Sequence, residues 1–255
     1  MKRIILLIGC TVFLFACLSK LSAQEFMIGI KAGTSIPNLH SDGTNEISEG
    51  YRSKLAENFG IIADIGISEK FSIKTGVDYA GQGGIRDGNQ PVTKLPAQFA
   101  QMIPEGTYLY ADFNNEASLN YIEVPLMGKL EWGNKLKYYV NAGPYIGFLL
   151  NAEQETDGNS LFYLDKNGTV PLTVQNQLLP SQSFDATTDI NDDIRSTNFG
   201  VTGGVGLGYS VGSKSSLVLD ARVAYGLHSI QEDTSSNGSS RTGGIFLTLG
   251  YLFAL

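Results

Sequence analysis

The chain has 255 residues, 42% of them hydrophobic and 17% charged, and its net charge at pH 7 is −7. This acidic balance argues against nucleic acid as a partner, because phosphate backbones repel negative surfaces. The length suits one domain, and no Gly/Ser-rich or Pro-rich linker divides the sequence.

The beginning of the chain has the pattern of an export signal. Two basic residues precede an apolar run over residues 4–18, and the small residue Ala23 follows a short polar stretch. This order predicts a secretory signal peptide over residues 1–23 and a mature domain over residues 24–255. A competing interpretation makes Cys17 a lipidated cysteine, although the bulky residue before Ala16 fits that signal poorly.

Both cysteines, Cys10 and Cys17, lie inside the predicted signal peptide. The predicted mature domain therefore offers no thiol for a disulfide, a metal site or a nucleophile. Without the three basic residues of the signal, it carries 15 Lys and Arg against 25 Asp and Glu.

Residues 120–132, NYIEVPLMGKLEW, show a pattern that recurs along the chain. Every second residue from Ile122 onward is apolar or small, whereas the residues between them include Glu123 and Lys129. Alternation with a period of two predicts a β-strand with one apolar face. The same alternation predicts eight strands, at residues 26–32, 59–67, 71–79, 120–132, 136–148, 199–209, 217–227 and 245–253.

The connections between these strands alternate in length. Tight turns are predicted at 68–70, 133–135 and 212–215, and long polar loops at roughly 35–56, 82–117, 151–195 and 229–240. Short turns at one end and long loops at the other are typical of outer-membrane barrels. We therefore predict an all-β fold, an eight-stranded antiparallel up-and-down transmembrane β-barrel with short periplasmic turns and long extracellular loops.

A soluble lipocalin-like barrel is the alternative, with its apolar face inside. Glycine is frequent on the polar face, which suits a crowded barrel interior better than an exposed strand. Aromatic residues gather at the ends of the apolar face, as at the two bilayer interfaces. These predicted interface aromatics are Phe26, Phe71, Trp132, Tyr138, Tyr209, Tyr251 and Phe253 on the periplasmic side, and Phe59, Tyr79, Phe148, Phe199 and Tyr225 on the outer side.

The polar face would then line the lumen. We expect its charges to pair across the barrel and fill it, with Arg222 paired to Glu123 or Asp64; an ion or proton pathway is the alternative. Pro125 lacks an N–H for the ladder, and a local bulge is one explanation. The predicted lumen charges are Lys31, Asp64, Lys74, Asp78, Glu123, Lys129, Asp220 and Arg222, together with Lys137.

Five segments resemble, in order, the signature of the PorT-like outer-membrane β-barrel family, often labelled "porin family". They are NYIEVPLMGK (120–129), NAGPYIGFLL (141–150), NFGVTGGVGLG (198–208), LDARVAYGL (219–227) and LGYLF (249–253). The resemblance covers nearly all of residues 24–255. It implies an outer-membrane barrel of a Gram-negative cell, in a family whose namesake is implicated in protein secretion across that membrane.

No pattern in the predicted mature domain specifies an active site. His40 and His228 lie in or beside predicted loops, and the nearby Ser229 and Asp233 do not form a triad spacing with His228. The acidic run 189–193 lacks the order of a calcium-binding loop. We expect no enzymatic activity, no cofactor and no bound metal.

Specific binding is expected in the long loops. Residues 161–174 predict a projecting hairpin, and the loop over 151–195 is strongly acidic. The loop over 82–117 carries apolar residues that either pack over the barrel mouth or contact a partner: Leu95, Phe99, Met102 and Ile103. We expect outer-membrane lipid around the barrel and an envelope or secretion protein at loops 82–117 and 151–195. The favoured role is structural or interactive, as a scaffold, adhesin or secretion accessory, and the alternative is a small-solute pore.

Overall fold

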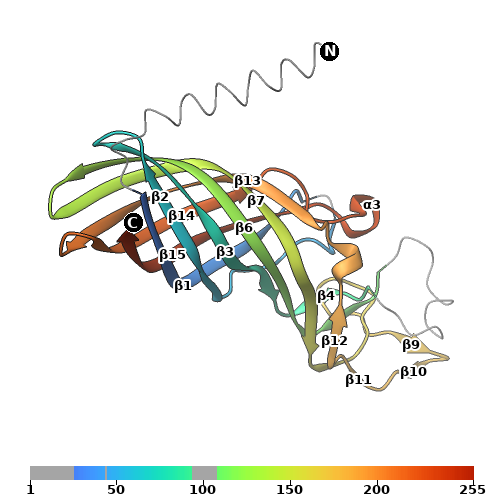
Figure 1. Ribbon diagram of the computed structural model, residues 1–255. Coiled ribbons are helices and arrows are strands. Elements are labelled where there is room, and N and C mark those ends of the chain that lie inside the picture. Colours follow the sequence, from blue (N-terminus) through green and yellow to red (C-terminus); the bar gives the residue numbers. More distant parts are fainter. Residues whose placement is uncertain (1–25, 44, 94–107) are drawn as a thin grey trace, which may run out of the picture.

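The computed structural model describes residues 26–43, 45–93 and 108–255, and these form a long β-barrel (Figure 1). The predicted signal peptide lies outside the described residues, as do Leu95, Phe99, Met102 and Ile103. None of the helices in the described ranges is long and apolar enough to cross a membrane. Eight long strands build the barrel: β1 (Phe26–Ser41), β2 (Ala56–Gly66), β3 (Phe71–Arg86), β6 (Asn114–Gly133), β7 (Leu136–Asp157), β13 (Thr197–Val211), β14 (Ser215–Gly226) and β15 (Ser240–Ala254).

These strands close into one ring. Each pairs antiparallel with the next long strand along the chain, and β15 returns to pair with β1 from Met27↔Ala254 to Ser41↔Ser240. Closure satisfies the hydrogen-bonding edges of the ring strands, as lipid requires. The predicted eight-stranded antiparallel up-and-down barrel is confirmed.

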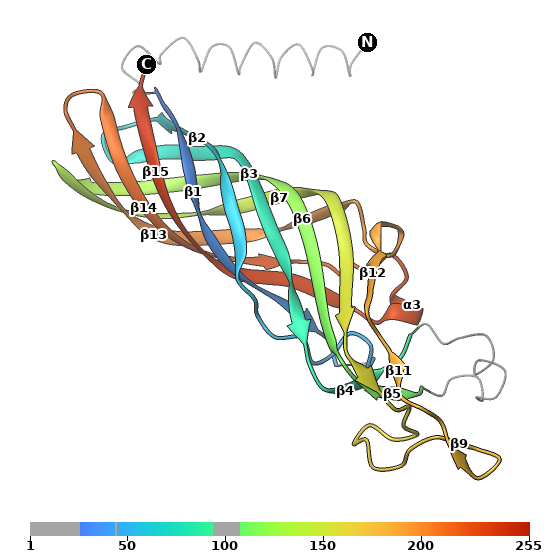
Figure 2. The same cartoon turned by 90° about the horizontal axis from the view of Figure 1, so that it is seen from below.

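The short connections match the predicted turns, at 67–70, 134–135 and 212–214. All three lie at the end of the barrel where β1 begins and β15 ends, while the long loops gather at the other end (Figure 2). In this second group are the short strands β4 (Asn89–Pro91), β5 (Tyr110–Asp112), β8 (Asn159–Ser160), β9 (Thr173–Val174), β10 (Gln177–Leu178), β11 (Gln182–Ser183) and β12 (Ala186–Asp189), the 3₁₀ helix η1 (Asn191–Asp193) and the helix α3 (Thr234–Asn237).

At the loop end, the strands are longer than predicted. β1 continues to Ser41, β3 to Arg86 and β7 to Asp157, and β6 already begins at Asn114. Parts of the predicted loops 35–56, 82–117 and 151–195 are therefore barrel wall. The boundaries were wrong because the apolar residues in these extensions face inward, which is the reverse of the pattern used to find the strands.

Pro125 interrupts the ladder without shifting it. Between β6 and β3 the pairing stops at Leu126↔Thr75 and resumes at Glu123↔Asp78 in the same register. The Thr75 hydroxyl donates a hydrogen bond to the Pro125 carbonyl at 2.7 Å. The register shift of this strand lies instead between Asn120 and Tyr121, on the side facing β7. A bulge at Pro125, one explanation for its place in the strand, is therefore not found at that residue.

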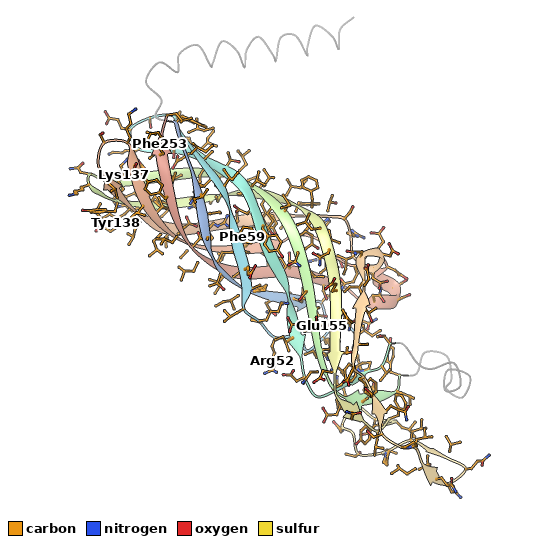
Figure 3. The ribbon with its side chains drawn as sticks, turned by 60° about the horizontal axis from the view of Figure 1, so that its bottom comes forward. Arg52, Phe59, Lys137, Tyr138, Glu155 and Phe253 are labelled. Carbon is orange, nitrogen blue, oxygen red and sulfur yellow. The ribbon has the colours of Figure 1, made fainter. Side chains whose placement is uncertain are left out.

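The surface of the barrel that faces away from the lumen carries an apolar band on the part of the wall nearer the short turns. Exposed Ile, Leu and Val side chains cover every ring strand. Of the twelve predicted interface aromatics, ten are exposed, and Phe26 and Tyr79 are half-buried. Figure 3 places Tyr138 and Phe253 near the short-turn end and Phe59 farther along the wall. The Phe59 and Tyr79 rings stack at 4.8 Å, which pairs neighbouring strands on this face.

Candidate functional site

The half of the lumen nearer the short turns, called the inner half, holds a network of charged side chains centred on Asp220. The half nearer the long loops is called the outer half. Its carboxylate accepts hydrogen bonds from the Tyr139 hydroxyl at 2.7 Å and the Asn141 amide at 3.2 Å. The Lys74 ammonium makes an ion pair with the same oxygen, and the Arg222 Nε lies 3.4 Å from the other one. All five side chains point inward because they occupy alternate positions of their strands.

Asp78 forms a second centre beside the first. Its Oδ2 lies 2.7 Å from the Lys31 ammonium and 3.3 Å from Arg222 Nη2. Arg222 therefore bridges two carboxylates, Asp78 and Asp220, and the expected pairing of Arg222 with Glu123 or Asp64 is wrong. Asp220 lies two residues before Arg222 on the same strand face, so one of its two carboxylates is a local one.

A third group lies toward the short turns. Lys129 contacts Asp64 at 2.5 Å and Glu131 at 2.6 Å, and Lys137 contacts Glu131 at 2.6 Å. Among the described residues of these three groups and Glu123, five cations stand against five anions: Lys31, Lys74, Lys129, Lys137 and Arg222 against Asp64, Asp78, Glu123, Glu131 and Asp220. Glu131 and Tyr139 were absent from the predicted network, although both stand at inward positions that the alternation identifies.

Glu123 stands apart from these pairs. Its carboxylate is buried and accepts a hydrogen bond from the Gln82 amide at 3.1 Å. Within the described ranges, it lies in no ion pair of 4.0 Å or less. The side chains of Tyr121, Tyr145 and Phe246 are also buried in the lumen. Polar and aromatic side chains thus fill the middle of the barrel.

Inward glycines make room for the largest of these side chains. A Cβ atom added at Gly206 would overlap the Tyr139 ring, and one at Gly200 would lie 2.6 Å from the Tyr145 ring. A Cβ at Gly204 would lie 2.9 Å from the Arg222 side chain. Each of these three glycines is paired in the ladder with the residue whose side chain it admits, so the inward glycines leave space for large side chains of the neighbouring strand.

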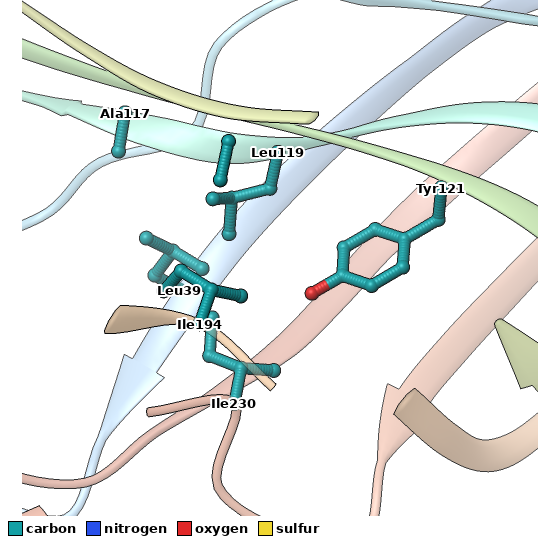
Figure 4. Close-up of a cluster of buried hydrophobic side chains, with 7 residues drawn as sticks. Leu39, Ala117, Leu119, Tyr121, Ile194 and Ile230 are labelled. Atoms are coloured by element: carbon teal, nitrogen blue, oxygen red, sulfur yellow. The ribbon is translucent and has the colours of Figure 1, made fainter. Parts of the chain in front are cut away.

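Beyond this network the lumen becomes apolar. A buried cluster joins the extended parts of the strands to two loop segments, and Figure 4 shows its side chains converging from opposite walls. Ile194 and Ile230 come from the loops, and Arg195 N donates to the Ile230 carbonyl at 2.7 Å, which ties those loops together. The cluster consists of Leu39, Ala117, Leu119, Tyr121, Ala152, Ile194 and Ile230. The loop segments close the outer mouth with hydrophobic contacts.

Two cavities enter the barrel from its ends. The inner cavity has a volume of about 560 Å³ and is lined by charged residues such as Lys129 and Glu131. The outer cavity has a volume of about 510 Å³ and is lined by Leu39, Leu119, Arg86 and the loop residues around them. Among the described residues, the two cavities share no lining side chain. Asp78 and Arg222, which line neither cavity, lie in the filled section of the lumen.

The long loop between β7 and β13 shares a second buried core with the described residues around β4 and β5. Phe162 and Phe113 are buried with Val92, Leu109 and Ala111. The Phe113 and Phe184 rings stack at 4.7 Å. The long loop therefore packs against the residues around β4 and β5, and β12 joins it to barrel strand β7.

A hairpin turns at residues 165–168, as predicted for 161–174. Leu164 N donates to Val170 O at 2.9 Å, and Leu172 N donates to Phe162 O at 2.7 Å. The Asp165 carboxylate accepts hydrogen bonds from the backbone N–H groups of Asn167, Thr169 and Val170. These bonds, with the one from the Thr169 hydroxyl, lower the pKa of Asp165. A second hairpin, β9–β10, follows directly.

The two histidines occupy separate surroundings. The His228 ring packs at 4.1 Å from Phe199, and the His40 ring lies 6.4 Å from Tyr225. In the parts of the chain that the structure describes, no group of three or more His, Cys, Asp or Glu side chains is arranged to hold a metal ion. Within the acidic run 189–193, the Asn191 side chain accepts a hydrogen bond from Ala152 N at 2.7 Å, which ties the run to β7.

A closed antiparallel ring with an apolar outer band and a polar filled lumen defines a transmembrane β-barrel. The sequence pattern of the family described as "Outer membrane protein beta-barrel domain" matches residues 22–232, and the chain belongs to this family. Its barrel therefore spans the outer membrane of a Gram-negative cell. No curated protein sequence matches the chain.

Several solved outer-membrane barrels are similar to this structure. Neisserial surface protein A has 12% sequence identity and a TM-score of 0.40, over 90% of this chain and 97% of that chain. Ail of Yersinia pestis has 13% identity and a TM-score of 0.39, over 90% and 99%. A major outer membrane protein from Thermus thermophilus has 13% identity and a TM-score of 0.46, over 91% and 100%.

Proposed function

We propose that this protein is a closed outer-membrane scaffold that presents its outer loops for binding at the cell surface. The observation that carries the proposal is the filled lumen. Buried ion pairs around Asp78 and Asp220 occupy its middle, and the apolar cluster around Leu119 lies above them. A barrel whose lumen is filled in this way can hold the outer loops in place but leaves no path for solutes.

The candidate binding surface is the end of the long loop, which we call the loop tip and define as residues 164–178. Three of its apolar side chains are about half exposed, Leu164 at 51%, Val170 at 47% and Leu178 at 54%. They lie far beyond the apolar band, where no lipid covers them. Exposed apolar side chains on an ordered hairpin are a common feature of protein-binding surfaces.

We also propose that the chain belongs to the PorT-like group within its family. The support is the ordered set of strand segments that begins with NYIEVPLMGK (120–129). On this basis the partner at loop 151–195 is an envelope or secretion protein. The described part of the predicted loop 82–117 is mostly strand and packs against the long loop, so it supports the same surface.

The alternative function is a small-solute pore, and the two cavities favour it. They extend the lumen from both ends, which leaves the section around Asp78, Arg222 and Asp220 and the contacts of the apolar cluster to be opened. Opening that section requires separating ion pairs buried away from water, which is costly. Because of this cost, transport is the less favoured function.

Site-specific photo-crosslinking in living cells tests the binding proposal. A photoreactive amino acid at Thr173, on the loop tip, is expected to give an adduct of discrete mass with an envelope protein. The same amino acid at the lipid-facing position Leu247 should give none. The triple variant Leu164→Ser, Val170→Ser, Leu178→Ser should remove the adduct while the barrel still inserts.

A matched triple variant of polar tip residues, Lys166→Ser, Asn167→Ser and Gln177→Ser, should leave the adduct in place. An absence of any Thr173 adduct in cells that display the intact barrel would contradict the proposal. Loss of insertion in the apolar triple variant would show instead that the loop tip serves folding.

A further inference from the structure

The outer cavity combines an apolar wall with a buried cation. Its volume of about 510 Å³ falls within the range of about 300–1,000 Å³ that small-molecule sites occupy. The apolar part of its wall comes from the strands and the long loop: Leu39, Val92, Phe113, Leu119, Phe162 and Ile230. All six belong to the two buried clusters, so the wall is held from behind by packed side chains.

Arg86, at the end of β3, supplies the cation. Its side chain is 8% exposed, and its Nη1 donates hydrogen bonds to the backbone carbonyls of Glu46 at 2.9 Å and Ile47 at 3.3 Å. The carboxylate of Glu46 is engaged elsewhere, as it accepts a hydrogen bond from the Tyr110 hydroxyl at 2.7 Å. Burial lowers the pKa of Arg86, and the nearby acidic groups, among them Glu46 and Glu49, only partly oppose this effect.

Arg86 differs from every other buried cation in the described ranges. Each of the others makes an ion pair with a carboxylate inside the barrel, namely Lys31, Lys74, Lys129 and Arg222. Arg86 makes no such pair within 4.0 Å among the residues that the structure describes. A buried charge with no carboxylate in direct contact is costly. An anion entering the cavity would remove that cost.

A buried acceptor in the same wall also lacks a partner. Asn115 is 6% exposed, and its Oδ1 makes no hydrogen bond within the described part of the chain. Its amide nitrogen donates to Gln90 Oε1 at 3.3 Å, and Gln90 in turn donates to the Phe113 carbonyl at 2.6 Å. The hydrogen bond to Gln90 orients the Asn115 amide. An ionised carboxylate has no hydrogen to donate to the Asn115 oxygen, so the head group is expected to contact Arg86 and not Asn115.

The remaining charges of the cavity lie at its rim. Asp185 and Asp193 line it and are both exposed, whereas Arg86 is buried. The anionic head group of an amphipathic molecule is therefore repelled by the two aspartates at the rim. The same head group is attracted by Arg86 inside the cavity. This arrangement directs an anionic head inward to Arg86 and leaves the hydrocarbon chain against Leu119 and Phe113.

We propose that the outer cavity binds a medium-chain fatty acid, with its carboxylate paired to Arg86 and its hydrocarbon chain on the apolar wall. This ligand site is separate from the loop-tip surface, and neither requires the other. A free fatty acid, rather than a membrane phospholipid, is the occupant because the cavity lies beyond the lipid-covered band.

Photo-labelling of the full mature protein in lipid nanodiscs tests the site. The probe is decanoic acid carrying a diazirine near its methyl end. Labels are expected on the cavity segments 113–119 and 184–194, and an excess of decanoate should suppress them. Decanol should compete at least tenfold more weakly, because it lacks the charge, and decyltrimethylammonium should not compete at that site.

Variants of Arg86 separate the charge from the apolar wall. Arg86→Gln should weaken decanoate competition by about ten- to hundredfold, the usual effect of losing a charged hydrogen bond. Arg86→Lys should retain part of the affinity. Arg241→Gln, at an arginine on the outward face bonded to Tyr225, is the matched control and should leave competition unchanged.

Three outcomes would overturn the proposal. Labels confined to lipid-facing positions such as Leu247 would show partition into the bilayer only. Equal competition by decanoate and decanol, or better competition by decyltrimethylammonium, would show that Arg86 does not select the ligand. These competition results come from the unmodified protein, so they decide the question even if Arg86→Gln fails to fold.

Discussion

The inner and outer halves of the lumen are built from the same strand positions but filled with opposite chemistry. On β6, Lys129 and Glu123 face inward in the inner half, and Tyr121 and Leu119 face inward in the outer half. The inner half is surrounded by lipid, so its polar side chains must find partners within the lumen. The outer half stands in water, where an apolar interior is stable as in any soluble barrel. The surrounding solvent decides which face of a strand is apolar.

The largest loss of stability should follow from removing a buried cation that lies between two carboxylates. Arg222→Leu leaves Asp78 with Lys31 and Asp220 with Lys74 but removes the cation between them. We expect the free energy of unfolding to fall by about 3–5 kcal/mol. Urea titration of the protein in lipid vesicles, followed by tryptophan fluorescence, would measure this. Arg241→Leu on the outward face should change it far less.

Truncation in the outer half should cost less. Leu119→Ala removes a buried side chain from the apolar cluster, and we expect a loss of about 2–3 kcal/mol, near the lower end for such changes because Leu119 already borders a cavity. The same titration measures the loss. Hydrogen exchange should also show faster opening of residues 190–195 than in the parent. Unchanged exchange there would contradict the role of the cluster in holding the loops.

Adding one methyl group to the inner half tests how tightly it is packed. A Cβ at Gly206 would overlap the Tyr139 ring, so Gly206→Ala should lower stability by about 1–3 kcal/mol. Gly208→Ala is the matched control, because its Cβ would meet its nearest atom, on Lys137, at 3.7 Å. Equal stability of the two variants would indicate a lumen loose enough to admit solutes.

The smallest expected effect is the loss of the helix cap at α3, in the outer loops, at low pH. The Asp233 side chain caps α3 by accepting hydrogen bonds from Ser235 N and Ser236 N, which lower the pKa of Asp233 to about 2. A lowered pKa means that the cap stabilises α3 above the ordinary pKa of aspartate and is lost as the pH falls through about 2. Amide exchange of Ser235 and Ser236 should therefore be slow at pH 5 relative to Asp233→Ala, and the difference should shrink near pH 2 and vanish only below it.

The sequence predicts the fold well because alternation is a local signal. All eight strands and the three tight turns follow from side chains two residues apart. The partners across the lumen do not, since they depend on the stagger between strands; Arg222 meets Asp78 on β3 rather than Glu123 on β6 for this reason. The outer cavity does not follow from the sequence pattern, because Arg86 lies in the predicted loop 82–117 and Leu119 lies just before the predicted strand 120–132, where the apolar residues face inward.

Ion conductance of the purified protein in planar bilayers tests most directly whether the lumen is closed. The buried pairs around Asp78 and Asp220, together with the cluster around Leu119, predict that the unmodified monomer shows no sustained conductance of porin size. Arg222→Leu should give brief openings more often than the parent. A steady, wide-open conductance in the unmodified monomer would contradict the closed lumen and make transport the leading function.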